Sequence, residues 1–458
     1  MKRWTIKTKK LYQLSLLFFA VLLFCIYSIN EKTTDNKNTL VILTFAINLF
    51  ISSIGFFSSV KKYPYSFCVS FWLFGIVFFS VAPLVQYLAS WTAWGLSATD
   101  DEIIRCNLLI SLWQICFHIG TKINYRIQST NHKKYYKRLS LRGILIVLAI
   151  SYAFSAILLY TNGFSGLLFR GSRVAISSNS TLSLLFFHVF RNTILYTFVF
   201  TLLFAKKNKT KQYLCFMAGF IFLLTCFPTS ISRYMAGAFY FGLLIIFLGK
   251  ENCNIWFTIL VFLGLTIAFP IFSVFRKIQT ISNLYNLGAL AKQAVSETFL
   301  TVNYDAHNMF ISVRQYTQFF GFSYGRQLLG ALLFFVPRTI WPGKPIGTGA
   351  MVISSFYQSS FTNVSMPLIG EAYVNFGVIG IVLFALAIGT VSSYLDKKYW
   401  TCQSNIQTIN IIYPFAVFYF FFLQRGDLLS SGAYLIANAT IGLLVSRLTT
   451  RRIYNFRE

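Results

Sequence analysis

Residues 368–394 read LIGEAYVNFGVIGIVLFALAIGTVSSY, and Glu371 is the only charged residue in this stretch. A helix of about 20 mostly apolar residues is long enough to cross the hydrocarbon core of a bilayer. The stretch therefore predicts a membrane-spanning helix that carries a carboxylate near one end.

The same pattern recurs along the chain, in which 56% of the 458 residues are hydrophobic and 11% are charged. Soluble domains carry about 25% charged residues. We therefore predict an all-α polytopic membrane protein, a single integral membrane domain over 1–458, with about twelve spanning helices. The other spans are expected near 11–29, 39–60, 66–88, 103–121, 142–160, 181–205, 212–228, 232–248, 255–275, 408–424 and 428–446. The first is interpreted as a span that stays in the protein, because its apolar run is longer than that of a signal peptide.

Basic residues set the predicted orientation. The formal net charge is +28. In a soluble protein this charge would suggest nucleic acid, but here we predict no such partner, because lysine and arginine hold loops on the cytoplasmic side. With twelve crossings, the basic connections all fall on one side, and both termini are then cytoplasmic. These connections are the N-terminus, 61–62, 122–142, 206–211, 250, 397–398 and the tail after 447.

Basic residues on the opposite side are mostly arginines. The planar guanidinium binds phosphate through two hydrogen bonds and keeps its charge, so this bias suggests an anionic ligand such as a phosphate or pyrophosphate. The alternative is that individual arginines bind lipid headgroups or carbonyls at helix ends. For Arg191, one helical turn from His188, both interpretations stay open. The arginines are Arg105, Arg170, Arg173, Arg191, Arg233, Arg276, Arg314, Arg326, Arg338 and Arg425.

One long segment, 276–367, separates the ninth and tenth predicted spans. Its aromatic and aliphatic residues predict a structured outer loop with short helices at the membrane interface. The piece RQLLGALLFF (326–335) is too short to cross a membrane. VPRTIWPGKP (336–345) follows it, with prolines that stiffen a turn and a tryptophan suited to the interface.

This region resembles the bacterial oligosaccharide repeat-unit polymerases, the Wzy-type enzymes of O-antigen and capsule synthesis. The resemblance covers about residues 270–395 and rests on a PR-x-x-W-P-x-K-P element and a following N-F-G-x-x-G element. The matching residues are Pro337, Arg338, Trp341, Pro342, Lys344 and Pro345, then Glu371, Asn375, Phe376, Gly377 and Gly380. Elsewhere the likeness is one of topology.

The resemblance implies an enzyme of lipopolysaccharide or capsule biosynthesis in the bacterial inner (cytoplasmic) membrane, with the large loop in the periplasm. Its donor and acceptor would be oligosaccharides linked to undecaprenyl pyrophosphate. The growing glycan would pass from its carrier to the terminal sugar of the next lipid-linked unit. No cofactor is expected, and the implied partners are membrane lipid and a chain-length regulator protein.

The chemistry of this transfer selects candidate residues. Fixed cations must stabilise the pyrophosphate leaving group, and without a metal-ligand pattern in the sequence we predict a metal-independent glycosyltransferase. The substrate-binding candidates are Arg338, Lys344, Arg276, Arg233, Arg425, Arg170, Arg173, Arg314 and Trp341. The acceptor hydroxyl needs a base, for which the candidates are Glu371, Asp305, His307 and Asp427. His307 enters by analogy with lipid-linked glycan ligases, which use a loop histidine, and its alternative is a partly exposed loop residue.

Two other functions compete with polymerisation. An O-antigen ligase shares the lipid donor and the architecture but relies on a loop histidine. A flippase for lipid-linked oligosaccharides would have more even loops and charges inside a central cavity between two similar halves.

Overall fold

The computed structural model describes residues 37–123, 135–169, 181–206, 208–253, 255–264, 298–356, 364–402 and 407–454. Seven spans within these ranges are long and apolar enough to cross a membrane, so the chain is a helical membrane protein. The expected span at 11–29 lies outside the described residues. The seven are α2 (Thr39–Lys62), the continuous run of α3 (Phe67–Ile76), η1 (Val77–Val81) and α4 (Ala82–Leu88), α5 (Asp100–Lys122), α6 (Leu141–Leu168), α7 (Thr181–Ala205), α16 (Leu368–Thr401) and α18 (Leu428–Thr449).

Four further helices are shorter or carry more polar ends. They are α8 (Gln212–Thr225), α9 (Arg233–Leu248), α10 (Ile255–Leu263) and α17 (Thr408–Arg425). A turn separates α8 from α9, in agreement with the separate spans predicted at 212–228 and 232–248. In this turn the amide of Ser230 donates to the carbonyl of Phe227 across 3.0 Å. Of the span expected at 255–275, the described part ends at residue 264.

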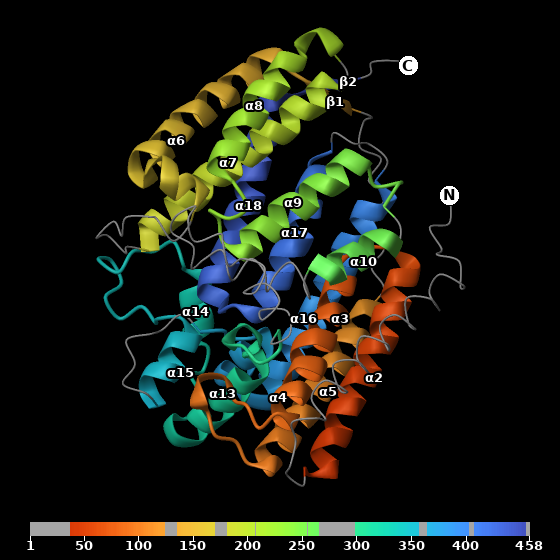
Figure 1. Cartoon of the computed structure of the whole chain (residues 1–458), viewed down its shortest axis with the longest axis vertical. Helices are drawn as coiled ribbons and strands as arrows, with labels where there is room; N and C mark the ends of the chain where they lie inside the picture. Colours follow the sequence, from red (N-terminus) through yellow and green to blue (C-terminus); the bar gives the residue numbers. More distant parts are fainter. Residues whose placement is uncertain are drawn as a thin grey trace, which may run out of the picture.

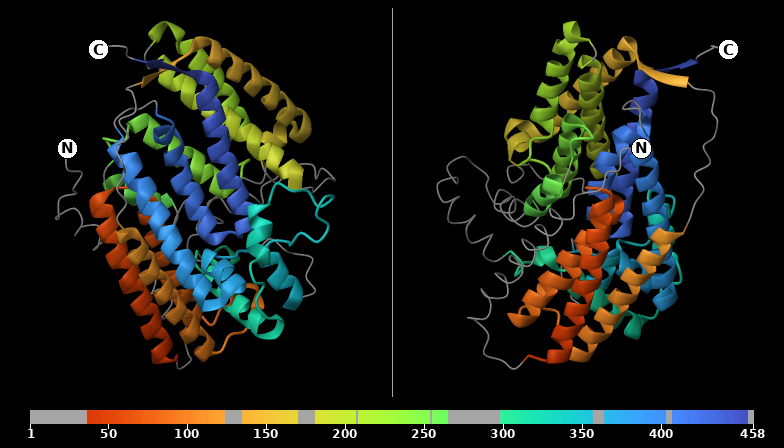
Figure 2. Two further views of the ribbon diagram at one scale, coloured as in Figure 1. Left: turned by 180° about the vertical axis from the view of Figure 1, so that it is seen from behind. Right: turned by 90° about the vertical axis from the view of Figure 1, so that its right-hand side faces the viewer.

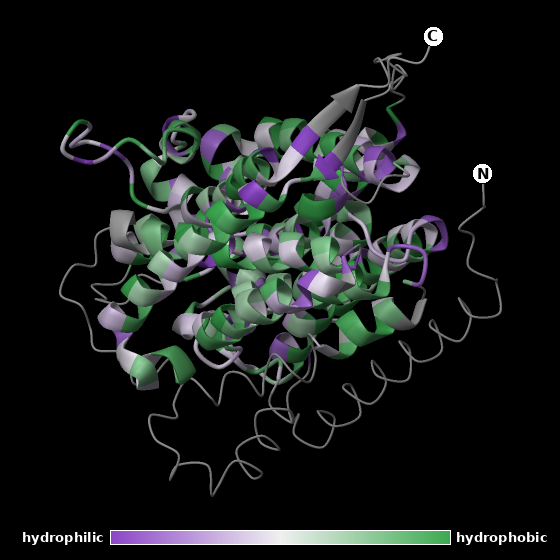
Figure 3. Cartoon of the chain, turned by 90° about the horizontal axis from the view of Figure 1, so that it is seen from above, coloured by the Kyte–Doolittle hydropathy of each residue, from purple (hydrophilic) through white to green (hydrophobic). Residues whose placement is uncertain are grey.

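The helices form two groups with the last helices of the chain between them (Figure 1). The first group joins α2, α3 and α5 to α16, which packs along α5 behind the view of Figure 1, as Figure 2 shows. The second joins α6, α7 and α8 to α18. α17 contacts α9, α18 and α3 and so connects both groups. Hydrophobic residues dominate the helices in Figure 3, as burial in a core or in lipid requires.

One end of the molecule gathers the basic connections, and we name it the basic end. Strand β1 (Tyr135–Leu139) pairs antiparallel with β2 (Thr450–Tyr454), which joins the loop before α6 to the tail after α18. The Nζ of Lys250 donates to the carbonyls of Tyr399 and Cys402 at 2.9 and 2.7 Å. Connections that the sequence assigned to one side therefore meet in space.

The opposite end, which we name the loop end, carries η7 (Val302–Tyr304) and three short helices, α13 (Ala306–Phe320), α14 (Arg326–Leu332) and α15 (Thr348–Phe356). α13 packs on α16 and α5, and α14 on α18 and α16. In the structure, the N-F-G-x-x-G element breaks α16, because Gly377 takes φ +60. A Cβ at Gly380 would lie 2.2 Å from the carbonyl oxygen of Ala372. The backbone therefore requires glycine at both positions, for its positive φ at 377 and for lack of space at 380.

Candidate functional site: an apolar cavity that ends at two arginines

A cavity of about 580 Å³ lies between α3, α9, α10 and α17. Its wall runs from Ser66, at the basic end of α3, to Arg425, at the loop end of α17. Much of the wall is aliphatic and aromatic, with residues such as Val69, Leu73, Val77, Ala236, Leu244, Val261, Val417, Phe418 and Phe421. A volume of this size is typical of a small-molecule site, and its wall suits an apolar chain.

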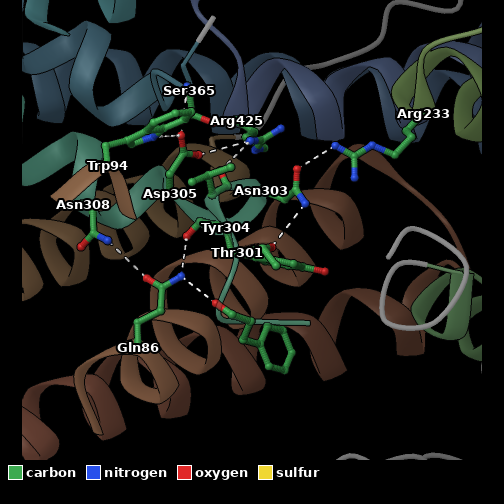
Figure 4. A network of polar contacts seen from close by, with 12 residues as sticks. Gln86, Trp94, Arg233, Thr301, Asn303, Tyr304, Asp305, Asn308, Ser365 and Arg425 are labelled. Carbon is green, nitrogen blue, oxygen red and sulfur yellow. Dashed lines mark hydrogen bonds and ion pairs between the residues drawn. The ribbon is translucent and has the colours of Figure 1, made fainter. Parts of the chain in front are cut away.

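Two guanidinium groups lie at the loop end of this cavity, those of Arg233 and Arg425, and Figure 4 shows their polar contacts. Arg233 begins α9, and its NH2 donates to Oδ1 of Asn303 at 2.7 Å. Arg425 ends α17, and its NH2 lies 3.2 Å from Oδ1 of Asp305 and 3.4 Å from the carbonyl of Val302. Both cations therefore rest on the segment that leads into α13.

Two polar atoms at this end have no hydrogen-bond partner in the described part of the chain. They are Nε of Arg425 and Oγ of Ser232, both buried, in residues that line the cavity. Buried polar atoms in folded proteins are nearly always satisfied by protein, water or ligand. The cavity therefore ends in positive charge, and two polar atoms of its lining residues are buried there without a partner in the described part of the chain.

Asp305, predicted as a catalytic base, is instead fully buried and surrounded by donors. Its Oδ2 accepts from Nε1 of Trp94 at 2.8 Å and from the amide of Ser365 at 3.3 Å, and its Oδ1 accepts from Arg425. A carboxylate that has no exposed surface and is paired with an arginine is poorly placed to take a substrate proton. The geometry supports a different part for Asp305, which is to position Arg425.

The segment before α13 is held by Gln86 of α4, as Figure 4 shows. Its Nε2 donates to the carbonyls of Phe299 and Tyr304 at 2.8 and 3.2 Å. The ring of Tyr304 stacks on Phe78 with centroids 5.1 Å apart. These contacts fix the height at which Asn303 and Asp305 meet the two arginines.

Glu371 of α16 lies beside Asp427, which is in the turn between α17 and α18. Oε2 of Glu371 accepts from Oγ1 of Thr348 at 2.7 Å, and its Oε1 accepts from the amide of Leu428 at 2.8 Å. Asp427 caps α18, with Oδ1 2.8 Å from the amide of Ser430. The residues Arg425, Gly426 and Asp427 thus carry a cation at the cavity and a carboxylate beside Glu371.

Burial raises the pKa of Asp427, although hydrogen bonds from Ser430 oppose the shift. The backbone at Gly347 lies close to this side chain: a Cβ at Gly347 would be 3.0 Å from Oδ2 of Asp427. Asp427 is partly exposed and Glu371 is buried. Asp427 is therefore the carboxylate better placed to meet a substrate.

The PR-x-x-W-P-x-K-P element forms a turn that is held by its own side chains. NH1 and NH2 of Arg338 donate to the carbonyls of Lys344 and Pro345 at 2.5 and 3.1 Å. Nζ of the buried Lys344 donates to the carbonyls of Phe334 and Val336 at 2.7 and 2.9 Å, and burial lowers its pKa. Their contacts are those of residues that hold a turn, not of a pyrophosphate site. Trp341 is half-buried on the same turn and does not line the cavity.

His307 and Arg314 face α5 from α13 rather than the cavity. Nε2 of His307 lies 2.9 Å from Oδ1 of Asn107, and NH1 of Arg314 lies 3.7 Å from Sγ of Cys106. Burial lowers the pKa of His307 to about 3, so the ring is neutral. Both residues hold α13 against α5, and neither lines the cavity with Arg233 and Arg425.

The remaining candidates lie elsewhere. His188 and Arg191 are buried between α7 and its neighbours, where Nε2 of His188 is 3.2 Å from the Tyr419 hydroxyl and Nε of Arg191 donates to the carbonyl of Thr225 at 3.3 Å. Neither lines the cavity. Arg170, Arg173 and Arg276 lie outside the described residues.

The structure adds polar residues that the sequence did not single out. Gln86, Trp94, Asn303 and Thr348 each contact a predicted site residue or its segment. Gln86 offered the one sequence signal, as an amide inside an apolar run. The chain matches no protein-family model, no curated protein and no solved structure.

Proposed function

We propose that the protein is a membrane-embedded glycosyltransferase that polymerises oligosaccharide repeat units carried on undecaprenyl pyrophosphate. The observation that carries the proposal is the apolar cavity that ends at Arg233 and Arg425. A polyisoprenoid pyrophosphate has matching chemistry, since its chain is apolar and its head is anionic. Part of the polyisoprenoid chain occupies the cavity, and the pyrophosphate group binds the two guanidinium groups.

The reaction exchanges one bond at the anomeric carbon of the donor glycan. The bond from this carbon to the pyrophosphate oxygen breaks, and the electron pair leaves with the pyrophosphate. The hydroxyl of the acceptor sugar forms the new glycosidic bond, and its proton passes to a carboxylate. Arg233 and Arg425 stabilise the charge that develops on the leaving group, and Asp427, beside Glu371, accepts the proton.

The charge distribution supports the orientation that this reaction needs. The basic end faces the cytoplasm, as lysine-rich and arginine-rich loops do, and the loop end faces the periplasm. The α13–α15 region then forms a structured part of the 276–367 loop. In this proposal about twelve spans place both termini inside, and a chain-length regulator acts on the product.

A deletion strain tests the function directly. We expect surface glycan that consists of single repeat units on the lipid anchor, and full complementation by the wild-type gene. Unchanged long-chain glycan contradicts the proposal. Loss of all surface glycan, single units included, indicates a flippase, while accumulation of finished polymer on the undecaprenyl carrier indicates a ligase.

A further inference from the structure

A second cavity, of about 550 Å³, lies at the loop end, and we name it the loop groove. Tyr316, Phe320 and Phe322 form its aromatic side, from the end of α13 and the turn after it. The turn 342–346 forms the opposite side. Arg326 and Gln327, which begin α14, and Met351 of α15 complete the lining. The P-x-K-P part of the motif thus belongs to this groove rather than to the cavity between the helices.

Both sides of the loop groove are held in place by contacts inside the protein. The turn 342–346 is fixed by Arg338 and Lys344, and a Cβ at Gly330 of α14 would lie 2.3 Å from Pro345. On the aromatic side, the amide and Oγ of Ser323 donate to the carbonyl of Val374 and to Oδ1 of Asn375 at 2.8 and 3.0 Å. A groove whose walls are already ordered loses little entropy when it binds a ligand.

The chemistry of the lining matches a sugar chain. Tyr316 and Phe320 stack with centroids 4.8 Å apart, and 58% of the Phe320 side chain is exposed, so ring surface is available to the C–H face of a pyranose. NH2 of Arg326 donates to the carbonyl of Gly343 at 3.2 Å, and the guanidinium has no carboxylate partner in the described part of the chain. Its other nitrogens can donate to hydroxyl or carboxylate groups of a neutral or acidic sugar.

The turn that lines the loop groove leads along the chain to the carboxylates of the proposed reaction. Ile346 lines the groove. The next two residues reach the carboxylates, since Gly347 passes over Asp427 and Thr348 donates to Glu371. The segment 346–348 therefore links the loop groove to both carboxylates.

We infer that the loop groove binds the acceptor glycan, with Phe320 stacking on a sugar ring and Arg326 binding its hydroxyl or carboxylate groups. This assignment of the acceptor rests on the proposed function. Sugar binding in the groove is a property that can be measured without catalysis. Phe320 and Arg326 then decide which repeat units the enzyme accepts.

The test uses the purified full-length protein in detergent. The probe is the oligosaccharide that mild acid releases from the host's own lipid-linked glycan, and saturation-transfer NMR reports its contacts with protein rings. We expect saturation of sugar C–H protons in the wild type. The double variant Phe320→Leu with Arg326→Gln should bind at least tenfold more weakly, a loss of about 1.4 kcal/mol. Leucine and glutamine keep most of the side-chain volume, so the fold is expected to persist.

Phe319→Leu is the matched control, because Phe319 is 76% exposed beside Phe320 but does not line the groove. Binding by the double variant within twofold of wild type overturns the inference. Glycan binding that depends on Phe320 and Arg326 in a protein whose deletion leaves polymer intact supports the groove and refutes the polymerase.

Discussion

Arg425 at the end of α17 forms an ion pair with Asp305 at the start of α13, with NH2 and Oδ1 3.2 Å apart. The carboxylate is fully buried, whereas the guanidinium is 20% exposed at the cavity. The pair joins residues that are 120 positions apart in the chain. It fixes the cation at the loop end of the cavity.

Arg425→Ala should abolish polymer, because one of the two cations at the leaving group is lost, while Arg425→Lys should keep part of the activity. Polymer length on gels of surface glycan measures both. Arg425→Ala should also lower the free energy of unfolding, by about 3 kcal/mol, since it leaves the fully buried Asp305 carboxylate without its cation. Arg105→Ala is the control, an exposed arginine of α5 outside the cavity. Normal polymer in Arg425→Ala removes this residue from the mechanism.

Gly237 gives a direct test of the cavity. It lines the wall, and a Cβ added there meets no neighbouring atom within 4 Å. Gly237→Leu should therefore fill part of the cavity without clashes, leave the melting temperature unchanged or higher, and reduce polymer at least tenfold by competing with the lipid chain. Gly237→Ala adds one methyl group and serves as the matched control, with activity near that of wild type. Full activity in the leucine variant at normal expression would exclude the cavity as the lipid site.

Asp427→Asn separates catalysis from folding. Asparagine caps a helix as well as aspartate does, so α18 should keep its start, whereas the loss of a general base reduces the rate by about 100-fold or more. Because burial raises the pKa of Asp427 and only the ionised form accepts a proton, wild-type activity should fall as pH is lowered, beginning above the range of a solvated aspartate. In vitro polymerisation by purified protein measures both effects. Asp101→Asn, at an exposed site on α5, should behave as wild type.

Arg338 should act through the turn that it holds. Arg338→Ala is expected to abolish polymer, and Arg338→Lys to retain part, because a lysine can still donate to one of the carbonyls of Lys344 and Pro345. Limited proteolysis distinguishes this role from direct ligand binding, since the alanine variant should be cleaved faster between 337 and 346. Full activity in Arg338→Ala, or lost activity with an unchanged cleavage rate, speaks against a positioning role.

His307 makes stability depend on pH. Its pKa is about 3 in the folded protein because of burial, and about 6.5 in an unfolded chain. The unfolded state therefore binds the extra proton between these values, so stability is complete above about pH 6.5 and falls by about 1.4 kcal/mol per pH unit below it. Melting curves in detergent at pH 7.5 and 5.5 measure the loss. His307→Gln can still donate to Asn107 and should have the smaller loss; an equal loss in both proteins contradicts the assignment.

The candidate site was predictable in composition but not in assembly. Arg233, Arg425, Glu371 and Asp427 were all selected from the sequence, because charged residues at the ends of apolar helices are conspicuous. The sequence did not predict that the two arginines lie together at the cavity, or that the two carboxylates form a separate pair. From the sequence, Arg338 was predicted to bind substrate and Asp305 to act as a base, whereas the contacts of both in the structure are with the protein.

The amino-acid sequence by itself determined the membrane class and most of the spanning helices, so that α2 begins at Thr39 as the hydropathy predicts. Transfer into lipid is a sum over consecutive residues, and charge in loops is likewise local, so both can be read along the chain. Only the tertiary structure decided what each charged side chain contacts. Helix rotation and the return of the long loop bring Asn303 and Asp305 to α9 and α17. Such contacts depend on residues far apart in the sequence, which no local pattern encodes.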